Sequence, residues 1–101
     1  MKNKLANFEK NLEYTFKDKN LLIKALTHTS SSQENNEVLE FLGDSVLNLI
    51  VTELLLEKFP DENEGFLSLM RSKLVSRKIL NKIANDFKLE DFLILGESFK
   101  N

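Results

Sequence analysis

The 101-residue sequence predicts an all-α fold, and three observations support that prediction. The chain has three glycines and one proline, so few residues interrupt helices. Its apolar residues recur at spacings of three and four, which places them on one face of a helix. Residues that begin and end helices, such as Asp18 and the Phe59-Pro60 pair, stand at the edges of these periodic segments.

Two short helices are expected at the start of the chain, over residues 5–12 and 19–26. In each of them the apolar residues share one face, which is expected to point inward. These positions are Leu5, Phe8 and Leu12 in the first helix and Leu22, Ala25 and Leu26 in the second. Asp18 stands where its side chain can cap the second helix. The polar residues 28–36 that follow are expected to form a loop.

The longest expected helix begins near Asn36 and ends at about Lys58, because the residue before Pro60 disfavours helical backbone. Apolar residues cover so much of its circumference that it is expected to be the central, most buried element. They are Leu39, Leu42, Val46, Leu49, Ile50, Val51, Leu54 and Leu55.

Two more helices are expected over residues 66–75 and 77–87, after a loop with the sequence PDENEG. The core face of the second of them is expected to consist of Ile79, Leu80, Ile83 and Ala84. A short apolar segment, FLILG, then ends at Gly96. The sequence contains no internal repeat, and its length predicts one domain.

Composition and charge exclude some classes of function. The net charge is −2, whereas a domain that binds nucleic acid through electrostatics alone usually has a pI above about 9. A nucleic-acid partner would therefore need a local basic surface. The absence of cysteine excludes disulfides and thiolate zinc sites. No apolar run is long enough to span a bilayer, so we expect no membrane partner and a cytoplasmic location.

The stretch NNEVLEFLGDSVL holds an arrangement that weakens a helix. Glu37, Glu40 and Asp44 are spaced to share one helical stripe, where each like-charged pair costs roughly 0.2–0.5 kcal/mol. Gly43 costs about 1 kcal/mol relative to alanine. The three acids can simply be the solvated side of the helix. Alternatively, they stand at the rim of a buried helix and bind a cation, for which carboxylate oxygens favour Mg²⁺ or Mn²⁺.

Two other polar residues each allow two interpretations. Glu64 lies at the end of the PDENEG loop, just before the fourth expected helix, where a carboxylate complements the helix dipole or is simply solvated, so it can be structural or part of an acidic site. His28 is the one histidine of the chain and can be a general base or a hydrogen-bonded structural residue. We favour the structural interpretation of His28.

Basic residues cluster in the fourth and fifth expected helices. A patch of this kind can bind the phosphates of a nucleic acid, and it can equally be an ordinary solvated surface. No aromatic residue is interleaved to stack on bases. The cluster consists of Arg71, Lys73, Arg77, Lys78 and Lys82.

The stretch NNEVLEFLGDSVL resembles the signature segment of the ribonuclease III family, approximately N-E-x-L-E-F-L-G-D-[AS]-[VI]-L. The flanking segments YTFKDKNLLIKALTHTS, FPDENEGFLSLMRSKLVSRKIL and FLILG match in order and spacing. The likeness extends from about residue 12 to residue 96. It implies an all-α fold like that of the ribonuclease III endonuclease domain, which dimerises and cleaves double-stranded RNA with a divalent metal, normally Mg²⁺ and alternatively Mn²⁺.

The resemblance also implies roles for individual residues. Asp44 and Glu40 correspond to catalytic, metal-binding acids, and Glu37 and Glu64 correspond to further acids that line the cleavage valley. Phe41 corresponds to an aromatic residue that inserts into a socket on the partner subunit. The residues expected to lie near the RNA backbone are Arg71, Lys73, Arg77 and Lys78.

The sequence departs from the family pattern after Gly96. The family takes two more metal ligands from a later helix with a D-x-x-E pattern, and ESFKN does not supply them. Residues 1–101 are therefore expected to form a C-terminally incomplete catalytic domain without a double-stranded-RNA-binding domain. The expected partner is a second copy or a complementing chain that carries the missing acids.

Two functions follow from these expectations. The first is a metal-dependent endoribonuclease for double-stranded RNA whose isolated activity is weak or absent. The second is a non-catalytic RNA-binding or dimerisation module derived from the same fold. A helical protein-interaction domain unrelated to RNA would require an accidental motif match. The missing later helices are expected to leave apolar surface exposed on the third helix, since a partner layer is absent.

Overall fold

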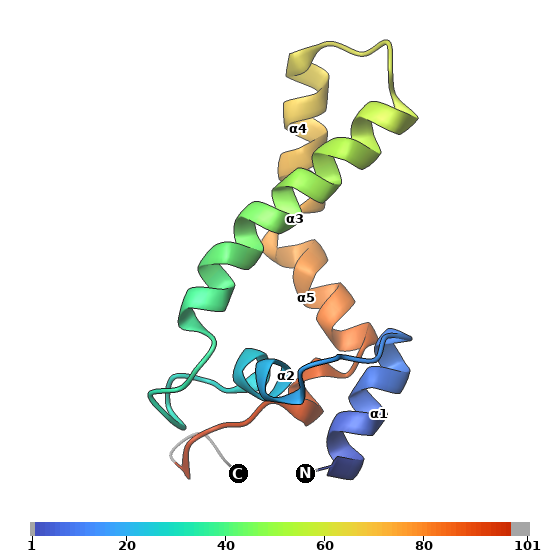
Figure 1. The fold of residues 1–101 in the computed structure, drawn as a ribbon. Coiled ribbons are helices and arrows are strands. Elements are labelled where there is room, and N and C mark those ends of the chain that lie inside the picture. The colour runs from blue at the N-terminus through green and yellow to red at the C-terminus, as the bar shows by residue number, and fades with distance from the viewer. Residues whose placement is uncertain (1, 98–101) are drawn as a thin grey trace. The chain divides into compact units, whose positions relative to one another are not determined.

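A computed structural model describes residues 2–97, and this part of the chain is helical, without a β-strand (Figure 1). The all-α prediction is therefore confirmed. The helices are α1 (Lys2–Leu12), α2 (Lys19–Leu26), α3 (Glu37–Lys58), α4 (Glu64–Leu74), α5 (Arg77–Asp86) and the 3₁₀ helix η1 (Leu89–Phe92). No helix within residues 2–97 has the length and apolar character needed to cross a membrane.

The chain divides into two compact units, and the division falls inside α3. The first unit contains the residues up to Glu40 together with those from Ala84 onward, and the second unit contains Phe41–Ile83. The first turn of α3 thus belongs to the first unit and the rest of this helix to the second.

A small apolar core holds the first unit together. Its buried side chains are Leu5 and Phe8 of α1 and Leu22 and Leu26 of α2. Phe92 of η1 packs on Phe8 with a ring-centroid distance of 5.1 Å. The predicted inward face of α1 and the two leucines of α2 are thus confirmed by the packing.

Ala25 is an exception, because its side chain is exposed although the helical spacing predicted that it faces inward. Burial of Leu22 and Leu26 already brings the inward side of α2 against the core. The small Ala25 side chain lies beyond the edge of that contact.

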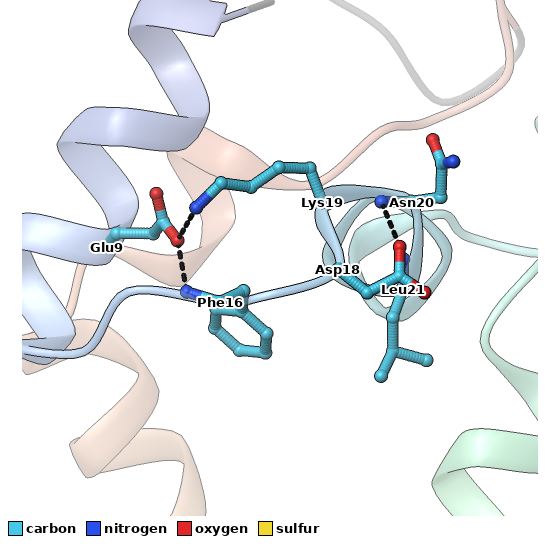
Figure 2. Close-up of polar contacts among 6 residues, drawn as sticks. All are labelled: Glu9, Phe16, Asp18, Lys19, Asn20 and Leu21. Carbon is cyan, nitrogen blue, oxygen red and sulfur yellow. Dashed lines mark hydrogen bonds and ion pairs between the residues drawn. The ribbon is translucent and has the colours of Figure 1, made fainter.

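Polar contacts fix the turn between α1 and α2 (Figure 2). One Glu9 carboxylate oxygen accepts hydrogen bonds from the Phe16 backbone N–H at 2.5 Å and from the Lys19 ammonium at 2.6 Å. Asp18 caps α2 by accepting from the backbone N–H groups of Asn20 and Leu21, as the sequence predicted. The Lys19 ammonium, and after it the Phe16 N–H, hold the pKa of the Glu9 carboxyl below its usual value.

Segments far apart in the sequence are joined by a short backbone clasp in the first unit. Thr27 and Ile94 form an isolated parallel β-bridge. The His28 N–H donates to the Ile94 carbonyl and the Ile94 N–H to the Leu26 carbonyl, both at 2.9 Å. Gly96 continues the contact, since its N–H donates to the Ser30 hydroxyl oxygen at 2.9 Å. A Cβ atom at Gly96 would lie 2.2 Å from the Ser30 carbonyl oxygen, so only glycine fits there.

The second unit has much less core. Leu55 is the one buried side chain within residues 41–83, with 5% of its surface exposed. The Phe59 and Phe66 rings meet edge to face at 5.3 Å where α3 leads into α4. Asn63 caps α4 by accepting from the Phe66 N–H, which explains why the helix begins at Glu64, inside the predicted loop.

The prediction that the longest helix is the most buried element is wrong for this structure. Its apolar residues surround the helix axis, but the described residues cover only part of that circumference. The exposed large apolar side chains of α3 are Val38, Phe41, Leu42, Val46, Leu49, Ile50, Leu54 and Leu56. This exposure agrees with the expectation that a further layer would be needed to cover the helix.

The predicted core face of α5 is also only partly formed. Ile79, Leu80 and Ala84 are half-buried, and Ile83 is exposed. The strong apolar periodicity of this helix therefore defines a face that the described residues do not fully cover.

Candidate functional site

The start of α3, which carries the first two acids, is tied to the end of α2. Asn36 donates its backbone N–H to the Thr27 carbonyl at 2.9 Å and its side-chain amide to the Ala25 carbonyl at 3.1 Å. The Asn36 carbonyl accepts the Glu40 N–H at 2.8 Å and so begins the helix. The packed first unit therefore fixes the backbone turn from which Glu37 and Glu40 project.

The three predicted acids of α3 are exposed. Glu37, Glu40 and Asp44 lie in its first turns, and none of them forms an ion pair within residues 2–97. The interpretation that these acids stand at the rim of a buried helix is wrong for this structure, because the apolar residues beside them are exposed to solvent too. The described residues bring no group of three or more acidic, histidine or cysteine side chains together as a metal site.

Gly43 has open space around it. A Cβ atom placed there would meet nothing within 4 Å. Packing within residues 2–97 therefore does not explain why a glycine stands at this position of the helix.

A cavity of about 310 Å³ lies between α3 and α4, and it includes the fourth predicted acid, Glu64. Leu55, Leu56 and Leu67 supply its apolar wall. Its polar lining consists of Thr52, Glu64, Ser68 and Arg71.

A line of hydrogen bonds connects this cavity to the turn that carries Asp44. The Arg71 guanidinium donates from Nη1 to the Thr52 hydroxyl oxygen at 2.8 Å. The Thr52 hydroxyl donates to the Asn48 carbonyl at 2.7 Å, and the Asn48 side-chain amide donates to the Asp44 carbonyl at 3.0 Å. Arg71 is half-buried, so this contact lies partly away from water.

The remaining predicted basic residues are exposed. Lys73 lies in the last turn of α4, and Arg77, Lys78 and Lys82 lie on α5. All four are in the second unit. They provide positive charge at the surface, and Arg71 differs from them because its guanidinium already has a protein partner.

Phe41, the predicted dimer contact, has 79% of its surface exposed. An aromatic ring in water forgoes the stabilisation that burial of a large apolar side chain gives, typically about 1.5–3 kcal/mol. The role of Phe41 and those of the acidic and basic residues above stay predictions.

His28 fits the structural interpretation. Its Nδ1 lies 2.7 Å from the Ser30 hydroxyl oxygen and accepts the Ser30 backbone N–H at 3.1 Å. The same hydroxyl oxygen receives the Gly96 N–H. His28 thus helps to shape the loop that the backbone clasp holds.

Sequence reasoning missed two features of the structure. Thr52 lies eight residues after Asp44 and continues its polar stripe through Asn48, which is a signal that helical spacing offers. The close approach of Gly96 to Ser30 has no comparable signal, since it joins residues far apart in the sequence.

Comparison with solved structures defines the class of fold. The chain is similar to the nuclease domain of ribonuclease III from Campylobacter jejuni, with a TM-score of 0.88 and 52% identity, over 97% of this chain and 67% of that one. A second structure of that domain gives a TM-score of 0.87 at 52% identity, covering 91% of this chain and 65% of the other. That second study concerns structural flexibility in a region involved in dimer formation of the Campylobacter domain. The fold is that of an all-α nuclease domain.

The family follows from the sequence comparisons. The ribonuclease-III-like family profile matches residues 18–101. Ribonuclease 3 of Campylobacter jejuni is 51% identical over all of this chain, and Ribonuclease 3 of Pseudomonas aeruginosa is 47% identical over 95% of it. The chain belongs to the ribonuclease III family, as the signature segment indicated. It spans 45% of the length of the Campylobacter relative and 42% of the Pseudomonas one.

Proposed function

We propose that this chain is the larger part of the catalytic domain of a metal-dependent endoribonuclease that cleaves double-stranded RNA. The observation that carries the proposal is a line of exposed carboxylates on α3, formed by Glu37, Glu40 and Asp44. This line stands in a chain that is 51% identical in sequence to Ribonuclease 3 of Campylobacter jejuni. Exposed like charges on one helix weaken it, so a role in binding cations explains why the sequence holds them.

The donor set is suited to Mg²⁺ but incomplete. Glu40 and Asp44 would hold the ion, since four-residue spacing puts their oxygens on one side of α3. Mg²⁺ often uses one or two carboxylates and completes its shell with water and substrate phosphate. Because no three acids come together within residues 2–97, we expect the remaining acids to come from sequence outside them, as in the family.

The residues of the chain would divide the work as follows. Glu40 and Asp44 would hold a divalent metal, which would supply an activated water and charge stabilisation at the scissile phosphate. The carboxylate oxygens of Glu40 and Asp44 would place that metal beside the scissile phosphate. Glu37 and Glu64 would add negative potential along the cleavage valley. Lys73, Arg77 and Lys78, together with Arg71, would contact the RNA backbone. Such contacts read the shape of an A-form duplex rather than its sequence.

The proposed partner is a second copy of the chain. Phe41 would insert its ring into a socket on that copy, which would remove an aromatic side chain that is 79% exposed here. Phe41→Ala is expected to shift the sedimentation of the chain toward the monomer. Leu49→Ala is a matched control on the same helix, and an unchanged dimer in Phe41→Ala would contradict this contact.

The decisive experiment is cleavage of a duplex RNA by a fusion in which this chain continues into the C-terminal part of the Campylobacter relative. We expect Mg²⁺-dependent cleavage by the fusion and little or none by the chain alone. Asp44→Asn should lower the rate by about 100-fold or more, because a metal ligand contributes several kcal/mol. Glu53→Gln removes another exposed acid of α3 and should retain activity.

The results have clear alternatives. An inactive fusion would contradict the proposed function. Strong cleavage by residues 1–101 alone would show that further acids are unnecessary.

A second candidate function is a non-catalytic RNA-binding module. The exposed basic residues of α4 and α5, together with the absence of a three-acid cluster within residues 2–97, favour it. Such a module should bind duplex RNA in a gel-shift assay, and Arg77→Ala and Lys78→Ala should lower that affinity. The fusion with the C-terminal part of the Campylobacter relative should then cleave no RNA.

A further inference from the structure

We propose that Arg71, Thr52 and Asn48 form a positioning relay that fixes Asp44 and Glu64 for the reaction. This inference rests on the proposed function and assigns Arg71 a structural task besides its predicted contact with RNA. All of these residues belong to the second unit.

The first step is the contact between α4 and α3. The Arg71 guanidinium donates to the Thr52 oxygen at 2.8 Å across a separation of 19 residues. Hydrogen bonds from a charged donor are stronger than neutral ones. Within residues 41–83 only Leu55 is buried, and the Phe59–Phe66 ring contact lies where α3 leads into α4. The Arg71–Thr52 hydrogen bond therefore adds a polar contact to a helix pair with little buried apolar packing.

The second step runs along α3. The Thr52 hydroxyl accepts from Arg71 and donates its own proton to the Asn48 carbonyl, which uses both capacities of a hydroxyl group. The Asn48 amide in turn donates to the Asp44 carbonyl. Side chains that bond to carbonyls four residues earlier adjust the local helix geometry. The relay therefore reaches the backbone turn from which the Asp44 carboxylate projects.

The third step concerns α4. Glu64, Ser68 and Arg71 line the same cavity and are spaced by four and three residues, so they share one face of the helix. When Thr52 holds Arg71, it also fixes the rotation that directs Glu64 toward α3. One contact thus orients two predicted acids on two helices.

The inference can be tested without altering charge. Thr52→Val keeps the shape of the side chain and removes the hydroxyl, whereas Thr52→Ser keeps the hydroxyl. In the active fusion we expect Thr52→Val to lower kcat by about three- to tenfold, the equivalent of one lost hydrogen bond. Duplex affinity, measured with Ca²⁺ in place of Mg²⁺, should not change. Thr52→Ser should match the unsubstituted protein, and Asn48→Ala should lower kcat in the same direction.

A double-substitution cycle separates coupling from general damage. The double variant with Arg71→Gln and Thr52→Val should have the same kcat as Thr52→Val alone. Arg71→Gln can still weaken RNA binding, because it removes a positive charge. Circular dichroism of each variant checks that the helices are retained.

The possible outcomes distinguish the two proposals. If the unsubstituted fusion cleaves RNA and Thr52→Val has the same kcat, the relay is overturned and the proposed function stands. If Thr52→Val lowers duplex affinity and leaves kcat unchanged, the relay is likewise overturned. If the unsubstituted fusion does not cleave, the proposed function fails and the relay falls with it.

Discussion

The two units of this chain differ in how their residues are stabilised. Among its described residues, the first unit buries four large apolar side chains and joins distant segments through backbone hydrogen bonds at Ile94 and through the Gly96 N–H, which donates to the Ser30 hydroxyl. The second unit buries only Leu55 and exposes most of the apolar residues of α3. Yet the second unit holds Asp44, Glu64 and all the predicted RNA contacts. The packed first unit therefore anchors the first turn of α3. Most of the predicted site lies on the second unit, on an apolar surface that further contacts would have to cover.

The largest expected effect comes from truncating the core of the first unit. Leu22→Ala removes a side chain that is 1% exposed and should lower the free energy of unfolding by about 2–5 kcal/mol. Leu54→Ala, at a position that is 58% exposed, should cost well under that in the same urea titration. Similar losses for the two variants would abolish the distinction between the units.

Gly96→Ala tests the backbone clasp. A new Cβ atom would lie 2.2 Å from the Ser30 carbonyl oxygen and 2.7 Å from its carbonyl carbon, which are backbone atoms with little freedom to move. We expect a loss of about 1–3 kcal/mol in the free energy of unfolding. Gly65→Ala is the control, because its nearest neighbour, the Asn63 side-chain oxygen, would be at an ordinary 3.4 Å. Equal stability of both variants would show that the clasp does not constrain the fold.

Gly43→Ala should have the opposite sign in the isolated chain. Nothing lies within 4 Å of the position of its Cβ, so the helical preference of alanine should stabilise α3 by up to about 1 kcal/mol. Thermal unfolding measures this gain. The same substitution in the active fusion shows whether a partner approaches Gly43 there, since a close contact would turn the gain into a loss of stability or activity.

The smallest expected effect is the pH dependence that Glu9 contributes. Since Lys19 and the Phe16 N–H lower its folded-state pKa, the carboxylate stabilises the fold fully above the unfolded pKa of Glu, about 4.3. That contribution is lost as the pH falls through the lowered folded-state pKa. Urea titrations from pH 7 downward should therefore show that the difference between Glu9→Gln and the unsubstituted chain shrinks toward acidic pH. A difference that stays the same from pH 7 to acidic pH would contradict this role of Glu9.

Local signals predicted most of the helices and the family, for reasons visible in particular residues. Asp18 caps α2 because a side-chain oxygen at that position can satisfy free N–H groups without help from distant residues. Helical periodicity likewise identified Leu5, Phe8, Leu22 and Leu26 as inward positions. The acids of α3 could be selected because helical spacing alone puts them on one stripe.

The sequence by itself determined the helices, their caps and the line of carboxylates, since these depend on interactions within a few residues. Only the tertiary structure decided that α3 is exposed, that Arg71 bonds to Thr52, and that Gly96 lies against Ser30. Those outcomes depend on which surfaces other segments cover and on contacts between residues distant in the sequence. Periodicity identifies an apolar face, but burial requires a second surface to pack against it.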